Sequence, residues 1–263
     1  MKLVTWNVNS LKVRLPRVLE FLDEHAPDIV CMQETKSEAA AFPLGELAAA
    51  GYDAVHHSVG RWAGVAIAAR HELELADPLA GLTGELRDDE ARWIEATVGG
   101  LRVASAYVPN GREVDSPTYD EKLAFLDAMA ARAAALRSQD APLVIAGDFN
   151  VAPTDLDVYD PRAFVGSTHV TPEERLRVEA IRAAGELVDA YRHLHPDDVQ
   201  HTWWDYRQGH FHRGLGLRID LALVSESLAR RLRHCGIERN YRKGKKPSDH
   251  APLAVDLAST RDD

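Results

Sequence analysis

The sequence predicts an α/β fold in which two β-sheets pack face to face and helices lie on the outside. Two observations support this fold class. Short strand-like runs outnumber long helical patterns along the 263 residues, and several of these runs are paired as hairpins. A doubly wound parallel sheet would instead alternate each strand with a helix. The pattern therefore favours a sandwich of two sheets.

The first half of the chain combines two predicted helices with several strands. Residues 11–26 place apolar side chains at helical spacing, and residues 42–51 form a shorter helical pattern that ends at Gly51. Residues 92–109 have the pattern of a hairpin whose turn lies at Gly99–Gly100. The other strands predicted in this half are 3–8, 28–34, 52–58 and 64–70.

The second half contains the clearest helical pattern, over residues 119–139. Another helix is predicted over 171–185, because Thr171 and Glu174 have the spacing of a capping box. The strands predicted in this half are 142–150, 218–225 and 250–258.

The composition limits the kinds of partner. The net charge is -10 and the pI is about 5.6, so bulk positive charge cannot explain nucleic-acid binding, although a local basic patch or a bound cation could. Cys31 and Cys235 cannot form a disulfide framework, and the sequence shows neither a signal peptide nor a membrane span. We therefore expect one soluble domain over residues 1–263, a cytoplasmic monomer with no membrane partner.

The predicted strand over 142–150 ends in two polar side chains. Gly147 is followed by Asp148 and Asn150, and we expect the glycine to let the chain turn without crowding its neighbours. Taken alone, the aspartate and the asparagine are ordinary turn residues whose side chains bond the backbone.

Other predicted strands also begin or end in polar side chains. These residues are Asn7, Glu34, Tyr107, Asn110, Asp220, Asp249 and His250. Each has an ordinary explanation, as a surface acid, a turn residue or a half-buried core residue. Because catalytic groups often sit on loops held by rigid strands, their joint occurrence predicts one pocket of carboxylates, amides, a phenol and an imidazole.

A series of segments resembles the exonuclease III family of metal-dependent apurinic/apyrimidinic endonucleases. In chain order they are WNVNSLKVRL, QETK, GVAI, YVPNG, GDFNVAP, RIDLAL and PSDHAPL, and they extend over nearly the whole chain. GDFN and SDH mark the wider endonuclease/exonuclease/phosphatase superfamily, whereas WNVNS, QETK, YVPNG and the basic run before PSDH indicate its DNA-repair branch. The resemblance implies a four-layer α/β sandwich.

The implied reaction is hydrolysis of the phosphodiester 5′ to an abasic site, leaving a 3′-hydroxyl, with 3′→5′ exonuclease and 3′-end trimming as further activities. The implied cofactor is Mg²⁺, with Mn²⁺ as a substitute; a hard oxygen donor such as Glu34 suits Mg²⁺, and no Cys/His cluster indicates zinc. By this resemblance the catalytic residues are Tyr107, Asp148, Asn150, Asp220 and His250, and the metal-site residues are Asn7, Glu34, Asp148, Asn150, Asp249 and His250. One or two metal ions are compatible with this set.

The resemblance also implies a role for each group. His250 would bond a phosphate oxygen, while Asp220 would accept from its other ring nitrogen and raise the imidazole pKa. Asp148 would orient and deprotonate the attacking water. The neutral amides of Asn7 and Asn150 would hold phosphate oxygens where another carboxylate would repel the substrate. The phenol would donate to a phosphate oxygen or assist the leaving group.

The expected partner is double-stranded DNA with abasic sites or 3′ ends. Residues 239–246, RNYRKGKK, hold five basic side chains in eight positions directly before Asp249, and we expect them to contact the DNA backbone. The predicted DNA-binding residues are Arg61, Asn110, Arg242, Lys243, Lys245 and Lys246, together with Trp203, Leu217 and Ile219 as apolar walls for a flipped-out abasic sugar. Many relatives carry Trp where this chain has Leu217, so the pocket walls differ.

Two alternatives to this function stay open. A superfamily phosphatase or phosphodiesterase acting on a non-DNA substrate would share GDFN and SDH, but the DNA-repair motifs disfavour it. A non-catalytic DNA-binding relative is disfavoured because Glu34, Asp148, Asp220 and His250 are all present.

Overall fold

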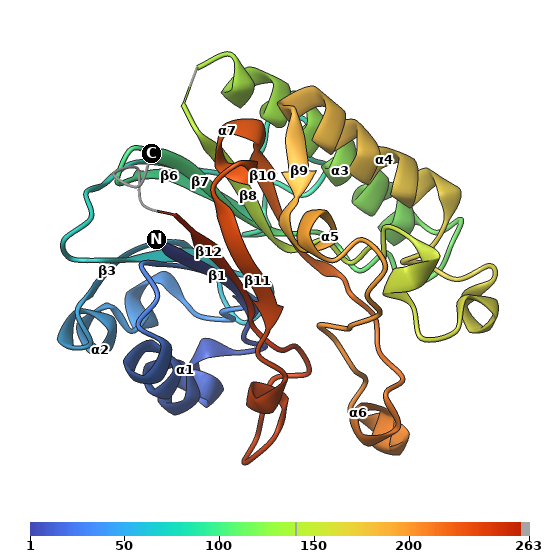
Figure 1. Cartoon of the computed structure of the whole chain (residues 1–263), viewed down its shortest axis with the longest axis horizontal. Coiled ribbons are helices and arrows are strands. Elements are labelled where there is room, and N and C mark those ends of the chain that lie inside the picture. Colours follow the sequence, from blue (N-terminus) through green and yellow to red (C-terminus); the bar gives the residue numbers. More distant parts are fainter. Residues whose placement is uncertain (140, 259–263) are drawn as a thin grey trace.

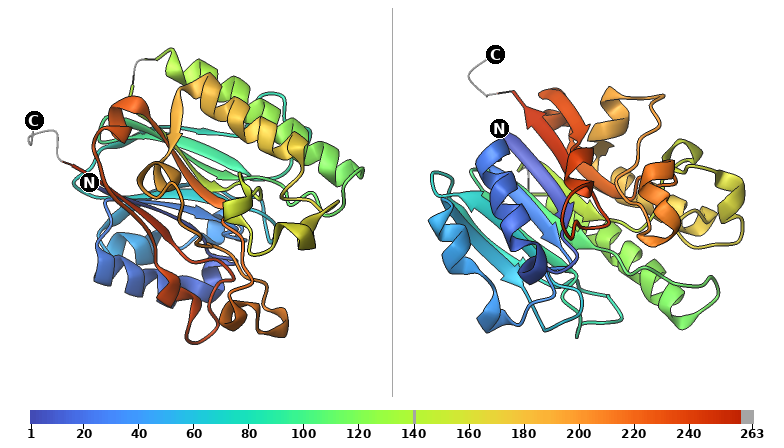
Figure 2. Two further views of the ribbon diagram at one scale, coloured as in Figure 1. Left: turned by 45° about the vertical axis from the view of Figure 1, so that its right-hand side comes forward. Right: turned by 90° about the horizontal axis from the view of Figure 1, so that it is seen from below.

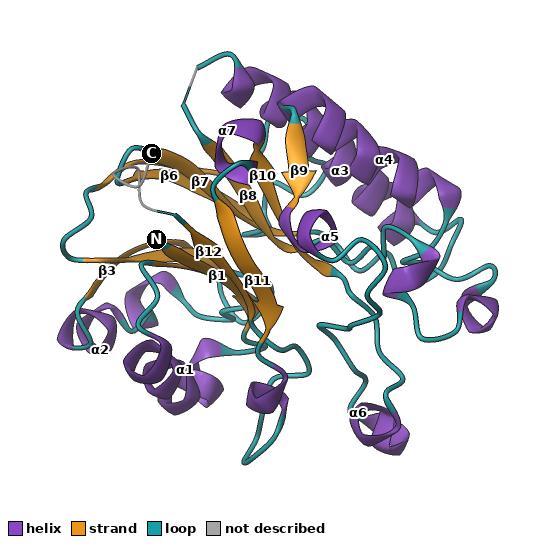
Figure 3. Cartoon of the chain, viewed as in Figure 1, coloured by secondary structure: helices purple, strands orange, loops and turns teal. Residues whose placement is uncertain are grey.

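The computed structural model describes residues 1–139 and 141–258. Two six-stranded sheets pack against each other, and helices cover both outer faces (Figures 1 and 3). This arrangement is the predicted four-layer α/β sandwich. In the described part of the chain, no helix is both long enough and apolar enough to cross a membrane.

The first sheet is built from both ends of the chain. Its strand order is β11-β12-β1-β2-β4-β3. The strands are β1 (Lys2–Asn7), β2 (Ile29–Gln33), β3 (Tyr52–His57), β4 (Val65–Arg70), β11 (Leu232–Ile237) and β12 (Leu253–Leu257). Helices α1 (Leu11–His25) and α2 (Leu44–Ala49) lie on its outer face, where Phe21 and Leu47 are buried against the sheet (Figure 1).

The second sheet is built from the middle of the chain, in the order β5-β6-β7-β8-β10-β9. Its strands are β5 (Leu75–Ala80), β6 (Trp93–Val98), β7 (Leu101–Tyr107), β8 (Leu143–Asp148), β9 (Leu187–Asp189) and β10 (Asp220–Ser225). Helices α3 (Pro117–Arg137) and α4 (Pro172–Gly185) run side by side over its outer face (Figure 2, left). The described residues also form the short α-helices α5 (Ala190–Leu194), α6 (His210–Arg213) and α7 (Glu226–Ala229).

The main hydrophobic core lies between the two sheets. Leu3 and Ile67 from the first sheet are buried with Val103 and Val144 from the second. Because successive strand residues point to opposite faces, the alternate residues of the same strands bury against the helices instead. Burying one large aliphatic side chain stabilises the folded state by about 1.5–3 kcal/mol. The many buried side chains between the sheets therefore give a stable sandwich that supports the loops at its end.

The strand directions explain why the polar strand ends converge. β1 and β2 are parallel and end at the same edge, where antiparallel β12 begins. In the second sheet β7 and β8 are parallel, and β10 is antiparallel to β8. Tyr107, Asp148 and Asp220 therefore share one row across three neighbouring strands. Both sheets present their polar residues at one end of the sandwich.

Several element predictions are confirmed in detail. Gly99 and Gly100 form the predicted hairpin turn, with φ of 54° and 83°, the left-handed conformation that a two-residue type I′ turn requires. Thr171 and Glu174 form the predicted capping box at the start of α4. Two late strands are shorter than predicted, because β10 begins only at Asp220 and β12 only at Leu253.

The expectation for Gly147 was wrong in its reason. The residue lies within β8 rather than in a turn. A Cβ at this position would lie 2.0 Å from the carbonyl oxygen of Ala106 on β7. The glycine is therefore needed for the close approach of two parallel strands immediately before Asp148.

Three strands were not predicted: β5, β9 and β11. β5 is an edge strand that contains Pro78, and its register with β6 shifts between Ala76 and Leu79. β9 has only three residues, and β11 exposes Arg233 and His234 at a sheet edge. These three strands lack the long apolar runs of central strands, so local pattern did not identify them.

Candidate active site

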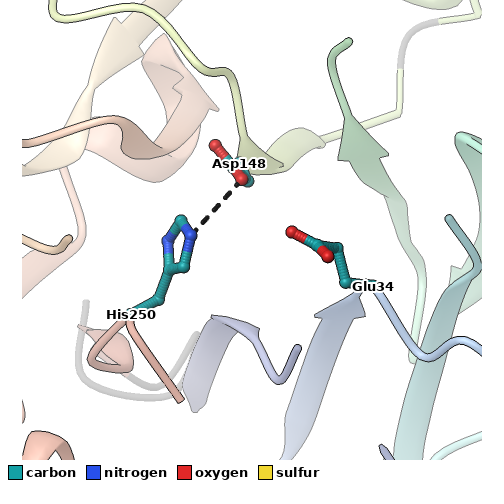
Figure 4. Close-up of side chains that lie close together, drawn as sticks. All are labelled: Glu34, Asp148 and His250. Carbon is teal, nitrogen blue, oxygen red and sulfur yellow. Dashed lines mark ion pairs between the residues drawn. The ribbon is translucent and has the colours of Figure 1, made fainter. Parts of the chain in front are cut away.

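A carboxylate–imidazole cluster lies at the end of the sandwich where the strand ends meet. Glu34 follows β2, Asp148 ends β8 and His250 precedes β12. Each offers one ligand atom, and these atoms lie within 4.8 Å of one another. Figure 4 shows the three side chains pointing toward a common space between the two sheets.

The amide of Asn7 holds the two carboxylates together. Its Nδ2 donates to Glu34 Oε1 at 2.8 Å and to Asp148 Oδ2 at 2.9 Å. Asn7 is completely buried at the end of β1. A neutral donor between two carboxylates offsets their mutual repulsion without adding charge.

Asp220 and His250 form a buried hydrogen-bonded couple. The imidazole Nδ1 donates to Asp220 Oδ2 at 2.8 Å, and its Nε2 lies 3.7 Å from Asp148 Oδ2. Burial disfavours the charged ring, but Asp220, Asp148 and Asp249 outweigh burial and raise the pKa of His250 to about 10. The ring is therefore a cation at neutral pH, with Nε2–H directed toward the cluster, so it can act as a hydrogen-bond donor to an anion.

Asp148 is the most perturbed carboxyl group of the site. Burial raises its pKa to about 7, while the His250 cation acts in the opposite direction. Its Oδ1 accepts from the backbone N–H of Asn150 at 2.9 Å, which fixes the plane of the carboxylate. A carboxyl group poised near neutral pH at the centre of a site is suited to proton transfer.

Asn150, Asn110 and Tyr107 form the rim of the site. Asn150 adopts a left-handed φ of 50°, and its Nδ2 donates to the Val108 carbonyl oxygen at 2.9 Å. Asn110 Nδ2 donates to Asn150 Oδ1 at 3.3 Å, so the two amides act as a pair. Burial, followed by the nearby Glu34 charge, raises the pKa of Tyr107 well above its usual range. The phenol therefore stays protonated and available as a donor.

Asp249 directly precedes His250 and is held by two donors. Trp203 Nε1 donates to its Oδ2 at 3.0 Å, and Asn9 Nδ2 donates to its Oδ1 at 2.9 Å. Burial pushes the pKa of Asp249 upward, but His250 and these two donors outweigh it and hold the pKa below its usual range. Asp249 is therefore an anion tied into the surrounding loops.

Sequence reasoning did not identify Asn9. This residue also accepts from Lys36 Nζ at 2.7 Å, and that ammonium lies 2.6 Å from Glu34 Oε2. Asn9 thus connects Asp249 to Glu34 through Lys36. The available signal was its place two residues after Asn7 in the WNVNS motif.

Lys122 and His169 were also not predicted. Both donate to the backbone carbonyl of Asn150, from Nζ at 2.7 Å and from Nδ1 at 2.6 Å. Lys122 is completely buried on α3 and also forms an ion pair with the buried Glu174. These contacts hold the backbone of Asn150 from outside the cluster. A lysine on the buried face of a predicted helix was the only sequence signal.

The donor set fits a divalent metal ion. Glu34 and Asp148 supply carboxylate oxygens within 4.8 Å of each other, and the groups that donate to Asp148, the Asn7 amide and the backbone and amide N–H of Asn150, are neutral. Hard oxygen donors in small number suit a cation that keeps part of its water shell. A ring nitrogen of His250 is the third atom of this set, and it would bind a metal only after losing its proton, whereas carboxylate oxygens keep free lone pairs.

The predicted DNA-binding residues fall into exposed and buried groups. Lys243, Lys245 and Lys246 are exposed on the loop between β11 and β12, and Arg61 is exposed on the loop between β3 and β4. Arg242 differs, because it is only 7% exposed and its Nη2 donates to the Trp204 carbonyl oxygen. Its guanidinium also packs over an aromatic ring of the same region. Arg242, which was predicted to contact the DNA backbone, is therefore buried and holds this loop in place.

The apolar residues expected to receive a sugar are closed in this structure. Leu217 is 1% exposed and Ile219 is 2% exposed, and both pack against Ala152 and Val158. Trp203 is half-buried and packs against the same cluster. The predicted walls do adjoin one another, but Leu217 and Ile219 present almost no free surface.

Comparison with known proteins places the chain in a family. The sequence pattern described as the Endonuclease/Exonuclease/phosphatase family matches residues 4–250. The chain belongs to this family. Exodeoxyribonuclease III of Haemophilus influenzae is 31% identical over 268 residues, which cover 96% of this chain and 98% of the relative.

Solved structures are similar in both fold and sequence. A 3′-5′ exonuclease, NExo, from Neisseria meningitidis has a TM-score of 0.95 and 38% identity, covering 98% of this chain and 100% of the other. A second structure of NExo, described as a 3′ phosphatase, is bound to a product DNA hairpin. An AP endonuclease from Archaeoglobus fulgidus has a TM-score of 0.93 and 36% identity, with the same coverage. These similarities confirm the predicted resemblance to hydrolytic DNA-repair nucleases of the exonuclease III type.

Proposed function

We propose that this chain hydrolyses phosphodiester bonds of damaged double-stranded DNA with Mg²⁺ as its metal ion and Mn²⁺ as a substitute. The observation that carries the proposal is the convergence of Glu34, Asp148 and the Asp220–His250 couple in one buried cluster. A non-catalytic DNA-binding relative would have no need for this costly burial of charge.

Each residue has a defined task in this proposal. The His250 cation donates from Nε2 to a phosphate oxygen, and Asp220 keeps the ring charged and oriented. Asp148 accepts the proton of the attacking water. The amide of Asn7 holds Glu34 and Asp148 in place, and the backbone N–H of Asn150 fixes the plane of Asp148. A divalent ion held by Glu34 and Asp148 would supply positive charge that stabilises the transition state.

Abasic sites are one proposed substrate. The chain would cut 5′ to the abasic sugar and leave a 3′-hydroxyl. The similarity to an AP endonuclease at 36% identity supports this choice. The exposed lysines 243, 245 and 246 and Arg61 are the proposed contacts to the DNA backbone.

Processing of 3′ ends is a second candidate, and one observation favours it. A flipped-out abasic sugar needs an open apolar pocket. Leu217 and Ile219, the proposed walls, are 1% and 2% exposed. A terminal 3′ phosphate or nucleotide can reach the cluster without that pocket. The similarity to a protein described as a 3′-5′ exonuclease and a 3′ phosphatase supports the same substrate.

One set of labelled duplexes tests both candidates. The same sequence is prepared with an internal abasic analogue, with a 3′ phosphate and with an ordinary 3′-hydroxyl end, and products are separated on a denaturing gel. We expect cleavage or trimming in Mg²⁺, none in EDTA and recovery when Mg²⁺ is restored. Full activity in EDTA would contradict the metal-dependent proposal. If all three duplexes stay intact while a soluble inositol polyphosphate is hydrolysed, the DNA substrate is wrong.

A further inference from the structure

A cavity beside the catalytic cluster extends the site toward an exposed tryptophan. It has a volume of about 550 Å³, and its lining includes Glu34 and Tyr107 of the site together with Trp62, Asn110 and Arg112. This volume lies in the range of pockets that hold small organic groups. The cavity is therefore continuous with the place where the phosphate would bind.

Trp62 is unusual among the tryptophans of this chain. It is 74% exposed, whereas Trp6, Trp93 and Trp204 are at most 2% exposed. Leaving a large aromatic side chain in water gives up the burial free energy that the other tryptophans provide. A flat aromatic surface beside a phosphate site is suited to stacking against a nucleic-acid base.

The loop that carries Trp62 is fixed relative to the catalytic cluster. Lys36 N–H donates to the carbonyl oxygen of Ala63 at 2.9 Å, and Thr35 N–H donates to that of Gly64 at 3.1 Å. A Cβ at Gly64 would lie 2.3 Å from Thr35 Oγ1, so the two segments approach closely. Because Thr35 directly follows Glu34, the backbone sets the separation between the tryptophan and the metal-site carboxylate.

The cationic side chains around the cavity differ in whether a carboxylate pairs with them. Lys36 pairs with Glu34, and Arg92 pairs with Glu90. Arg112 is exposed, and the structure places no carboxylate from the described residues within ion-pair distance of it. In a chain of net charge -10, a free cation beside an exposed aromatic ring favours an anionic, base-bearing ligand.

We infer that Trp62 is a stacking platform for an unpaired base of the DNA strand that enters the active site, and that Arg112 contacts the phosphate of that nucleotide. A base inside a duplex is already stacked on both faces, so the platform acts on frayed ends and 3′ overhangs. Trp62 is therefore a specificity determinant that favours DNA with an unpaired 3′ segment. This inference rests on the proposed function in one respect, because it assumes that DNA is the substrate.

Binding without cleavage provides the test. The substitution Asp148→Asn is introduced to keep the DNA intact, and Kd is measured by fluorescence anisotropy in Mg²⁺. The two probes are labelled duplexes of one sequence, one blunt and one with a three-nucleotide 3′ overhang. Adding Trp62→Ala should raise Kd for the overhang about fivefold or more and leave the blunt duplex within about twofold. Trp62→Phe should retain most of the overhang affinity because it keeps an aromatic face.

Two further variants complete the design. Arg112→Ala should weaken overhang binding and reduce its salt dependence by about one phosphate contact. Leu176→Ala is the matched control, because Leu176 is 69% exposed on the outer helix α4, and its removal should change neither Kd.

Defined outcomes separate this inference from the proposed function. If Trp62→Ala raises Kd equally for both probes, the ring contacts the duplex backbone, and the stacking role is overturned. An unchanged overhang Kd would overturn it as well. Failure of the Asp148→Asn protein to bind either probe would instead contradict the choice of DNA as substrate.

Discussion

His250 Nδ1 lies 2.8 Å from Asp220 Oδ2, and the opposite ring nitrogen faces Asp148 at 3.7 Å. The imidazole is therefore held between two carboxylates that come from adjacent strands of the second sheet. This arrangement keeps the ring charged and directs one N–H into the catalytic space. The consequences of breaking it can be measured.

Replacing Asp220 by Asn should lower the cleavage rate about 100-fold or more, because the ring loses the anion that orients and charges it. Binding of uncut DNA should change much less. The rate is measured on the preferred duplex under single-turnover conditions. Asp160→Asn serves as control, since Asp160 pairs with the exposed Arg162, and its rate should stay near wild type. Equal rates for the two variants would remove Asp220 from the mechanism.

Replacing Asp148 by Asn should abolish turnover and spare DNA binding. The amide keeps the shape of the side chain but cannot accept the proton of the attacking water, so a loss of about 100-fold to 10,000-fold is expected. Gel assays give the rate and anisotropy gives Kd. A rate near wild type would show that another group activates the water.

Replacing Gly147 by Ala should destabilise the fold by about 3 kcal/mol or more, because the new Cβ would lie 2.0 Å from a carbonyl oxygen of β7. The free energy of unfolding is measured in urea. Gly45→Ala is the matched control, since no atom lies within 4 Å of a Cβ there and Gly45 is in helix α2. That change should stabilise by up to about 1 kcal/mol. Similar effects at both sites would contradict the close approach of β7 and β8.

Stability should fall in acid partly because of His201. Burial, aided by Arg239, lowers the pKa of His201 to about 4, below the 6.5 of an ordinary histidine. The unfolded chain then binds the proton first, so stability falls as pH drops from about 6.5 to about 4 and this effect is complete below that pH. The variant His201→Gln should lose less stability between pH 7 and pH 4.5 than wild type in urea unfolding. Identical losses would mean that the buried ring is not responsible.

Removing the exposed lysines 243, 245 and 246 together should weaken DNA binding and flatten its salt dependence. Each lost phosphate contact reduces the slope of log K against log salt by about 0.9. Arg242 is left in place because it is buried and supports the loop. A triple change of Arg137, Arg182 and Arg230 to Ala removes the same charge at the C-terminal ends of α3, α4 and α7, and should leave the slope unchanged. A wild-type slope in the lysine variant would contradict the contact.

The sequence by itself identified the central strands of both sheets and the edge strand β3 as strands, and it identified which polar residues lie at their ends. Buried strands have continuous apolar runs, and the motif around Asp148 interrupts such a run abruptly. Glu34, Asp220 and His250 could be selected in the same way, because polar side chains at the ends of apolar runs are a local signal. Edge strands such as β5 gave no such signal.

Only the tertiary structure decided which of these side chains touch and which are free. The parallel and antiparallel pairings bring Glu34, Asp148 and His250 to one edge from positions far apart in the chain. Burial likewise depends on packing between distant segments, so the closed state of Leu217 and the structural role of Arg242 had no local signature. The exposed position of Trp62 beside the site follows from the same long-range packing.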